Sequence, residues 1–253
     1  MLLELNLDGT QLISAKNVVE PREIFMGTVL APWPNRLRDG RYKLAGKQFE
    51  FTNLDGQNNL NHGLSSNVDF KVLTHQGNQL VIGCRFGLDA GYPFDVDLEV
   101  TYQLESDALE VMAVAQNCEP QPVPFALGFH PYFLAGDDFE LVGDFTGRIL
   151  ADERMLPKGS ERISGLKFTG GQIDDCFFGA KTATLQTSEG KVEIELGENM
   201  NYFMFYRPGL DVGESLLAIE PMSDPANVFA DDIESVLIAP GEKKVFSFVI
   251  RKR

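Results

Sequence analysis

The chain has 253 residues, 43% of them hydrophobic, and its 22 basic against 37 acidic side chains give a formal net charge of −15. This acidic balance argues against nucleic acid or an anionic membrane as a partner, because both recruit basic patches. No apolar run approaches the roughly 20 residues of a membrane-spanning helix, and MLLELNLDGTQ lacks the basic start of a signal peptide. We expect a single cytoplasmic domain over residues 1–253, since no linker-like break in composition divides the chain.

Two segments near the N-terminal end hold polar residues in unusual settings. In APWPNRLRDGRY (residues 31–42), two prolines bracket Trp33, the only tryptophan, ahead of Asn35 and Arg36. An arginine fork can donate paired hydrogen bonds to vicinal hydroxyls, and an aromatic ring can stack on the apolar face of a sugar. A turn with surface charge fits the same segment equally well. In NNLNHG, His62 stands among asparagines, where a turn residue and a ligand contact are both consistent with the pattern.

The centre of the chain predicts antiparallel strands. After the apolar QLVIGCRF, the segment FDVDLEVTYQLE (residues 94–105) alternates apolar and polar residues without a break. This period of two is typical of a strand with one buried face and one wet face. A short interruption separates it from ALEVMAVAQN (residues 108–117), which we expect to be its hairpin partner.

The next segment, GFHPYF (residues 128–133), places His130 between aromatic residues and proline at the end of a predicted strand. A packed imidazole hydrogen-bonded to backbone and a proton donor in a ligand cleft are both consistent with this setting. Further along, GQIDDCFF carries Asp174, followed by Asp175, directly after Ile173. Asp174 is either a hydrogen-bonding group in a cleft or a turn residue.

The C-terminal third predicts a second hairpin in TATLQTSEGKVEIELG and short strands in NYFMFYR, LLAIEP and KVFSFVI, with one short helix in NVFADDIES. Glu220 ends the apolar strand of LLAIEP, flanked by Ile219 and Met222. A carboxylate in that setting is poorly solvated unless it reaches a cleft or a partner. Burial would raise its pKa above the unperturbed value of ~4.3, which makes a better base.

These elements predict an all-β fold, a large antiparallel β-sandwich. No dozen residues carry a helical apolar stripe, and 24 glycines and 13 prolines punctuate the strands at short spacing. The chain has no GxSxG elbow, no phosphate-binding P-loop and no GxGxxG fingerprint. Its three histidines are too scattered for a HExxH-type metal site, so we expect neither a metal nor a cofactor.

Taken in order, five segments resemble the aldose 1-epimerase (galactose mutarotase) family: NRLRDGRYKLAG, NHG, GFHPYF, IDDCF and LAIEPMSDPANVF. The resemblance spans residues 26–229 and implies the family's fold, the galactose mutarotase-like supersandwich. The glycine after His62 is followed by Leu64 where the family often has a second glycine, and Leu134-Ala135 replaces a frequent Asn-Leu. Together with the short chain, these departures indicate a less characterised branch.

The resemblance implies substrate-binding roles for several residues. Arg36 corresponds to the arginine that binds sugar hydroxyls, and His62 to the histidine that contacts the sugar near its ring oxygen. The sugar-binding aspartate corresponds most simply to Asp174, with Asp175 as the competing alignment. Asn35 and Trp33 are further candidates for contact with the sugar. The expected partner is a monosaccharide, and the expected assembly is a monomer or homodimer.

By the same resemblance, His130 corresponds to the general acid and Glu220 to the general base of anomer interconversion. Opening the cyclic hemiacetal requires a base at O1 and an acid at the ring oxygen O5, so Glu220 takes the O1 proton while His130 donates to O5. With an unperturbed pKa of ~6.5, His130 is a usefully protonated donor if a carboxylate-rich site raises its pKa, and only nearby charges count toward such a rise.

Three alternatives stay open. A mutarotase for hexose 6-phosphates needs a cationic pocket, which Arg36, Arg38 and Arg207 could supply. A non-catalytic carbohydrate-binding module would keep the hydroxyl contacts but has no need of a matched acid and base. A glycoside hydrolase or lyase would use Asp174 and Glu220 as a carboxylate pair, although the histidine-centred motifs disfavour it.

Overall fold

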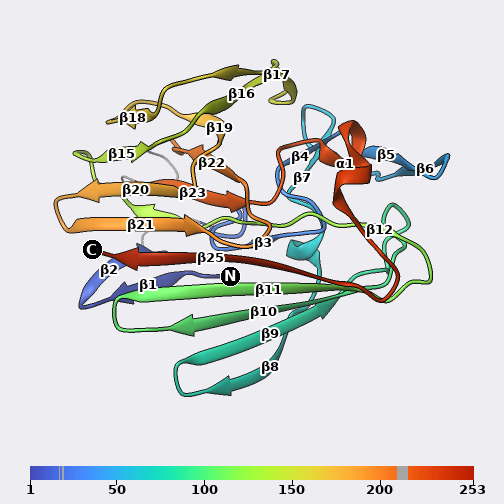
Figure 1. Ribbon diagram of the computed structural model, residues 1–253, viewed down its shortest axis with the longest axis horizontal. Coiled ribbons are helices and arrows are strands. Elements are labelled where there is room, and N and C mark those ends of the chain that lie inside the picture. The colour runs from blue at the N-terminus through green and yellow to red at the C-terminus, as the bar shows by residue number, and fades with distance from the viewer. Residues whose placement is uncertain (17, 19, 210–215) are drawn as a thin grey trace.

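The computed structural model describes residues 1–16, 18, 20–209 and 216–253. Over these residues the chain forms two large sheets in which all strand pairs are antiparallel, with several two-stranded ribbons at their margins. The large antiparallel β-sandwich predicted from residue alternation is therefore confirmed. Figure 1 shows the strands β20, β21, β25, β11, β10, β9 and β8 following one another down the view, with the second sheet above and behind them.

The first sheet has nine strands in the order β18-β15-β20-β21-β25-β11-β10-β9-β8. Its long central strands pair over most of their length, because each presents alternating apolar residues to one face. The bounds are β18 (Leu166–Phe168), β15 (Glu140–Gly143), β20 (Thr182–Thr187), β21 (Gly190–Leu196), β25 (Lys243–Lys252), β11 (Ala108–Asn117), β10 (Val96–Leu104), β9 (Gln79–Arg85) and β8 (Lys71–Gln76).

The second sheet is ordered β17-β16-β19-β22-β23-β13-β3, and β14 also pairs with β23. It is less regular, because β23 pairs with β22 along one side and with the short strands β13 and β14 along the other. The bounds are β17 (Pro157–Arg162), β16 (Gly147–Ala151), β19 (Asp174–Phe178), β22 (Tyr202–Tyr206), β23 (Leu216–Met222), β13 (Gly128–Phe129), β3 (Val29–Leu30) and β14 (Tyr132–Leu134).

Outside the two large sheets, the described residues form four two-stranded ribbons and three short helical turns. The ribbon of β4 and β7 matters most below, because it stands beside the second sheet and carries polar residues toward it. The bounds are β1 (Glu4–Leu7) with β2 (Thr10–Ser14), β4 (Arg36–Arg38) with β7 (Asn59–Asn61), β5 (Arg41–Leu44) with β6 (Lys47–Glu50), β12 (Val123–Pro124) with β24 (Leu237–Ile238), the α-helix α1 (Val228–Asp231) and the 3₁₀ turns η1 (Ser65–Asn67) and η2 (Ile233–Val236).

The predicted elements correspond closely to observed ones. The alternating segment becomes β10, whose Val96, Leu98 and Val100 are fully buried, and it pairs in continuous register with β11 as expected. The second hairpin becomes β20 and β21. The short helix predicted in residues 227–235 is confirmed as α1, one turn long, followed by the 3₁₀ turn η2.

The core lies between the two sheets and is rich in phenylalanine. Phe129 of β13 meets Phe248 of β25 across the interface, with ring centres 4.8 Å apart. On β22, Phe203 and Phe205 are fully buried in this core. Because side chains alternate along a strand, the residues between them, such as Met204, point to the opposite face of the second sheet. That opposite face is where a cavity lies.

Candidate active site

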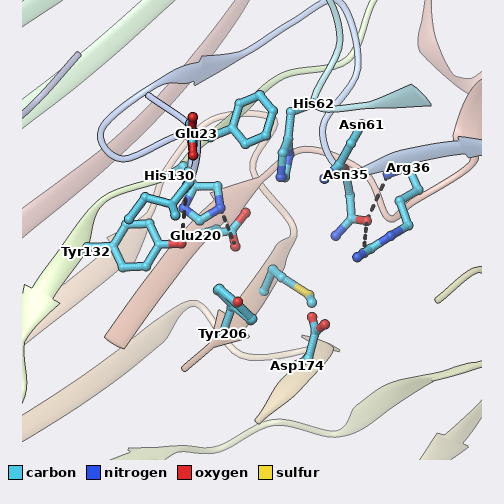
Figure 2. Close-up of a pocket in the computed structure, with 13 residues that line it drawn as sticks. Glu23, Asn35, Arg36, Asn61, His62, His130, Tyr132, Asp174, Tyr206 and Glu220 are labelled. Atoms are coloured by element: carbon cyan, nitrogen blue, oxygen red, sulfur yellow. Dashed lines mark hydrogen bonds and ion pairs between the residues drawn. The ribbon is translucent and has the colours of Figure 1, made fainter. Parts of the chain in front are cut away.

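A cavity of about 260 Å³ lies against the second sheet, between β22 and β23, the β4–β7 ribbon and the loop ahead of β3. Ligand pockets for drug-sized molecules typically measure ~300–1,000 Å³, so this one suits a smaller ligand. Figure 2 shows the polar side chains converging on it from elements far apart in the chain. Its lining comprises Glu23, Ile24, Phe25, Asn35, Arg36, Asn61, His62, His130, Tyr132, Asp174, Met204, Tyr206 and Glu220.

The β4–β7 ribbon places Arg36 and Asn61 opposite each other in register, so both reach the cavity from the same end of the ribbon. The next residue, His62, has a φ of +60° and donates its backbone N–H to the Asn35 carbonyl at 2.8 Å. Gly63 follows with a φ of +68°, and a Cβ there would lie 2.2 Å from the Ala31 carbonyl oxygen. Only glycine fits such a close left-handed approach, which explains the His-Gly pair in physical terms.

The ribbon is anchored at both ends by residues from later in the chain. Asn227 donates its backbone N–H to the Arg36 carbonyl at 2.6 Å and accepts the Arg38 N–H on its side-chain oxygen at 2.9 Å. At the far end, Arg154 donates to the side-chain oxygens of Asp39 and Asn59, both at 2.9 Å. These contacts fix the backbone of the ribbon that carries Arg36 and leads into His62.

His130 and Glu220 meet at the floor of the cavity. His130 follows β13, and its backbone is fixed by hydrogen bonds with Thr28 and Gly27 at 3.1 and 2.8 Å. Glu220 lies on β23, and its Oε1 is 3.3 Å from Nε2 of His130. The imidazole also stacks on Tyr132, with ring centres 4.8 Å apart and planes 10° apart. Figure 2 shows the two groups facing each other beside Tyr132.

Burial governs the protonation of this pair. Side-chain exposure is 4% for His130 and 2% for Glu220, and burial penalises the charged form of each. Burial lowers the pKa of His130 to about 3, and it raises the pKa of Glu220 well above 4.5, with the nearby Asp174 adding to the rise and Arg36 opposing it. The condition that the site raises the pKa of His130 is therefore not met, because desolvation by burial outweighs the opposing effect of a backbone hydrogen bond. Both shifts favour the uncharged forms, a neutral imidazole beside a protonated carboxyl group.

His62 is also held neutral. Its pKa is lowered well below 6.5 by burial first, and then by His130 and Arg36. Its ring centre is 5.1 Å from that of His130, so two neutral imidazoles lie side by side. A neutral imidazole offers one nitrogen as donor and the other as acceptor, which suits contact with hydroxyl groups.

Asp174 and Asp175 separate onto the two faces of β19. Asp174 lines the cavity, and burial raises its pKa, helped by Asp175 and opposed by Arg36. Asp175 is absent from the cavity lining and accepts from the Arg148 guanidinium at 2.7 Å. The alternation of side chains along a strand therefore makes Asp174 the residue that faces the cavity.

Several buried polar atoms of the lining have no hydrogen-bond partner among the described residues. Such atoms are rare in folded proteins and call for an explanation. Here they include donors and acceptors together, which is the pattern that a ligand rich in hydroxyl groups can satisfy. They are Nε of Arg36, Oδ1 of Asn61, Nδ1 of His62, Nδ1 of His130 and Oε2 of Glu220.

Of the two further candidates for contact with a ligand, Asn35 lies in the cavity lining and Trp33 lies in the core. Asn35 lines the cavity and accepts from the Arg36 backbone N–H at 2.8 Å and from its Nη1 at 3.2 Å, so it orients the guanidinium. The prediction that Trp33 contacts a ligand is wrong. Trp33 is 1% exposed and packs between Phe51 and Phe229 in the core, at 5.2 and 5.3 Å between ring centres. Its apolar surface makes the core the more favourable place for it.

Sequence reasoning missed part of the lining. Glu23, Ile24 and Phe25 come from a loop with no periodicity or motif that could have indicated them. Met204 and Tyr206 could have been found, since they alternate with the core residues of β22. Among the described residues, no group of three or more His, Cys, Asp or Glu side chains is placed to hold a metal ion. No helix in the described ranges is long and apolar enough to cross a membrane.

Comparison with known proteins is consistent across sequence and structure. The family described as aldose 1-epimerase matches residues 2–251. The chain is 26% identical to the uncharacterised protein YihR of Escherichia coli, over 95% of this chain and 83% of that one. It is 27% identical to the galactose mutarotase of Sus scrofa over 53% of this chain, a match that covers 42% of the pig protein.

Solved structures share the fold. An aldose epimerase homologue from C. elegans superposes with a TM-score of 0.82 at 17% identity, covering 96% of this chain and 88% of that one. Galactose 1-epimerase from Lactobacillus acidophilus superposes with a TM-score of 0.75 at 18% identity, covering 99% of this chain and 87% of that one. At identities of 17% and 18%, these two likenesses show a shared fold and nothing further.

Proposed function

The chain belongs to the aldose 1-epimerase family, and from that premise we propose that it is a mutarotase that interconverts the α and β anomers of a free aldose. The observation that carries the proposal is the contact of 3.3 Å between His130 and Glu220 inside a small polar cavity. A buried acid–base pair that holds one proton can give a proton to one oxygen of a hemiacetal while it takes one from the other.

The reaction opens the ring at the C1–O5 bond, allows rotation about C1–C2 and closes the ring on the other face of C1. Glu220 removes the O1 proton while His130 protonates O5, and ring closure returns both protons. The O1–H bond and the C1–O5 bond break, C1 becomes a carbonyl carbon, and no electrons are gained or lost overall. The neutral resting pair differs from the reactive form, His130 protonated and Glu220 ionised, only by the position of one proton.

Positioning falls to the polar groups around the pair. Arg36 donates and Asp174 accepts, so together they can hold vicinal hydroxyls of the sugar. In this proposal His62, whose ring centre lies 5.1 Å from that of His130, contacts the ring-oxygen side of the sugar. These contacts turn O1 and O5 toward Glu220 and His130, which is the orientation that the proton transfers require.

The charge of the cavity favours an uncharged sugar over a hexose 6-phosphate. Apart from the uncharged His130–Glu220 pair, two acidic side chains, Glu23 and Asp174, line it against one guanidinium, that of Arg36. Arg38 and Arg207 are absent from the lining, and the Arg207 guanidinium lies 5.0 Å from the ring centre of Phe139 instead. A phosphate group would therefore meet net negative charge.

A non-catalytic sugar-binding module is the second candidate, because the orphan hydrogen-bonding atoms would serve a binder equally well. The buried pair argues against it. Burying an imidazole and a carboxyl group costs free energy, and a protein that only binds hydroxyls has no need of both in contact.

Polarimetry tests the proposal. Freshly dissolved α-D-glucose or α-D-galactose should lose optical rotation faster with the protein than without it, and His130→Asn should remove the excess rate. D-glucose 6-phosphate should show little acceleration. Acceleration on phosphosugars alone would select the hexose 6-phosphate alternative, and binding of free sugars without acceleration would select the module. New reducing ends released from glycosides would indicate a hydrolase.

A further inference from the structure

The loop ahead of β3 forms a wall of the cavity that neither the sheet nor the ribbon supplies. Glu23, Ile24 and Phe25 line the cavity from this loop. Of the three, Phe25 contributes an aromatic ring, half-buried, whose centre lies 4.7 Å from that of His62 at an angle of 61°. The ring therefore contacts a residue of the proposed binding site and borders the space where the sugar would lie.

This loop is firmly tied to the rest of the site. Gly27 donates its backbone N–H to the His130 carbonyl at 2.8 Å, and Tyr132 donates its hydroxyl to the Ile24 carbonyl at 3.3 Å. Within the loop, Met26 donates to the Pro21 carbonyl at 2.9 Å. The backbone on either side of Phe25 is thus fixed to the segment that carries His130.

Phe25 occupies a conformation that costs free energy. Its φ is +55°, in the left-handed region, where an L-residue other than glycine is disfavoured by roughly 1–2 kcal/mol. A bulky aromatic residue is especially rare there. Such strain persists where the surroundings impose it, and it concentrates at ligand-binding sites. The fold holds the Phe25 ring at the cavity despite this cost.

A pyranose ring presents C–H groups as well as hydroxyls, and an apolar surface is needed to desolvate them. Trp33, the aromatic residue expected to do so, lies in the core. Tyr132 has one face covered by His130. Arg36, Asp174 and His62 provide polar contacts only. Met204 and Tyr206 line the cavity from β22, and Phe25 is the aromatic side chain that lines it from the loop.

On the premise of the proposed function, we propose that Phe25 is a sugar-binding residue whose ring packs against the apolar C–H face of the pyranose. Removal of the ring weakens binding and leaves the proton transfers of His130 and Glu220 in place. Aromatic contacts of this kind are worth roughly 0.5–1.5 kcal/mol beyond buried area. The expected change is a rise of roughly three- to tenfold in KM or Kd.

The test compares Phe25→Leu, Phe25→Tyr and wild type in mutarotation of α-D-galactose. Phe25→Leu should raise KM roughly three- to tenfold with kcat within about twofold, and Phe25→Tyr, which keeps the ring, should stay close to wild type. Phe70→Leu is the matched control, because Phe70 is also half-buried but lies outside the cavity lining. An unchanged KM in Phe25→Leu, or an equal rise in Phe70→Leu, would overturn the inference.

Isothermal titration with D-galactose separates this inference from the proposed function, because it measures binding whether or not the sugar is turned over. Wild-type binding without turnover would contradict the proposed function, and the ratio of Kd between Phe25→Leu and wild type would still decide the role of Phe25. Absence of any sugar binding would contradict both. Melting temperatures should show Phe25→Gly at least as stable as Phe25→Leu, because glycine relieves the positive φ; a much less stable glycine variant would mean that strain plays no part.

Discussion

Strands β10 and β23 lie in different sheets and differ in the burial of their glutamate side chains. On β10, apolar residues alternate with exposed or half-buried polar ones, and Glu99 points to solvent. On β23 all seven residues are buried, including Glu220. The outer face of β10 is open to water, whereas the outer face of β23 is covered by the ribbon, the loop and His130. Because β23 is buried on both faces, the pKa of Glu220 is raised, and its carboxyl group lies in contact with His130.

The first way to test this contrast is to neutralise one carboxylate on each strand. Glu220→Gln should reduce the mutarotation rate by roughly 10²–10⁴, because it removes the proposed base while it keeps nearly the same shape. Glu99→Gln should leave the rate unchanged, since Glu99 is exposed and absent from the cavity lining. Polarimetry with α-D-galactose measures both. Equal rates for Glu220→Gln and wild type would remove Glu220 from the mechanism.

A second, smaller effect should separate the two neighbouring acids of β19. Asp174→Asn should raise KM by roughly tenfold to a hundredfold, because a hydrogen bond to a charged acceptor contributes about 1.5–3 kcal/mol. Asp175→Asn should leave KM unchanged and lower stability by at most about 1 kcal/mol, since its partner Arg148 is partly exposed to solvent. Steady-state kinetics and thermal melting decide between them. A rise in KM for Asp175→Asn alone would reverse the assignment.

The smallest effect concerns stability as a function of pH. Because the folded-state pKa of Glu220 is raised above 4.5, its contribution to stability is fully present below that value and is lost as pH rises through the folded pKa. Removal of the carboxyl group removes this loss. Glu220→Gln should therefore gain stability relative to wild type as pH rises above 4.5, by at most about 1.4 kcal/mol per pH unit. Urea unfolding at several pH values measures the difference, and a constant difference from pH 5 to 8 would contradict the raised pKa.

His130 contributes with the opposite sign. Its pKa is lowered to about 3, so the neutral folded form stabilises the protein fully above 6.5 and this contribution is lost as pH falls toward 3. In Glu220→Gln the histidine contribution stands alone, so unfolding free energy should rise more steeply from pH 4.5 to 6.5 than in wild type. The same urea series measures this slope.

Much of the fold could be predicted, because long strands carry their own signal. The alternation of residues 94–105 directly indicates one buried and one wet face, and β10 follows it. The short strands β13 and β14, which position His130, have two and three residues. They are too short for periodicity, and their pairing with β23 depends on contacts far along the chain.

The candidate site was predicted in part for the same reason. Arg36, His62, His130, Asp174 and Glu220 stand in motifs and all line the cavity, although their roles remain predictions. Trp33 was misplaced, because an aromatic residue between prolines gives no sign of which side of the chain it packs on. Phe25 could not be found, because its place depends on a loop conformation that the whole fold imposes. The low pKa of His130 depends on burial, which composition does not reveal.

The central claim is that the His130–Glu220 pair exchanges the anomers of a free sugar. Two-dimensional exchange NMR on equilibrated D-galactose measures this directly, through cross-peaks between the α and β anomeric protons. Wild type should produce these cross-peaks at a rate proportional to protein concentration, and His130→Asn and Glu220→Gln should each reduce them to the level of buffer. Cross-peaks that persist undiminished in both variants, or are absent from wild type with every free aldose tested, would contradict the account.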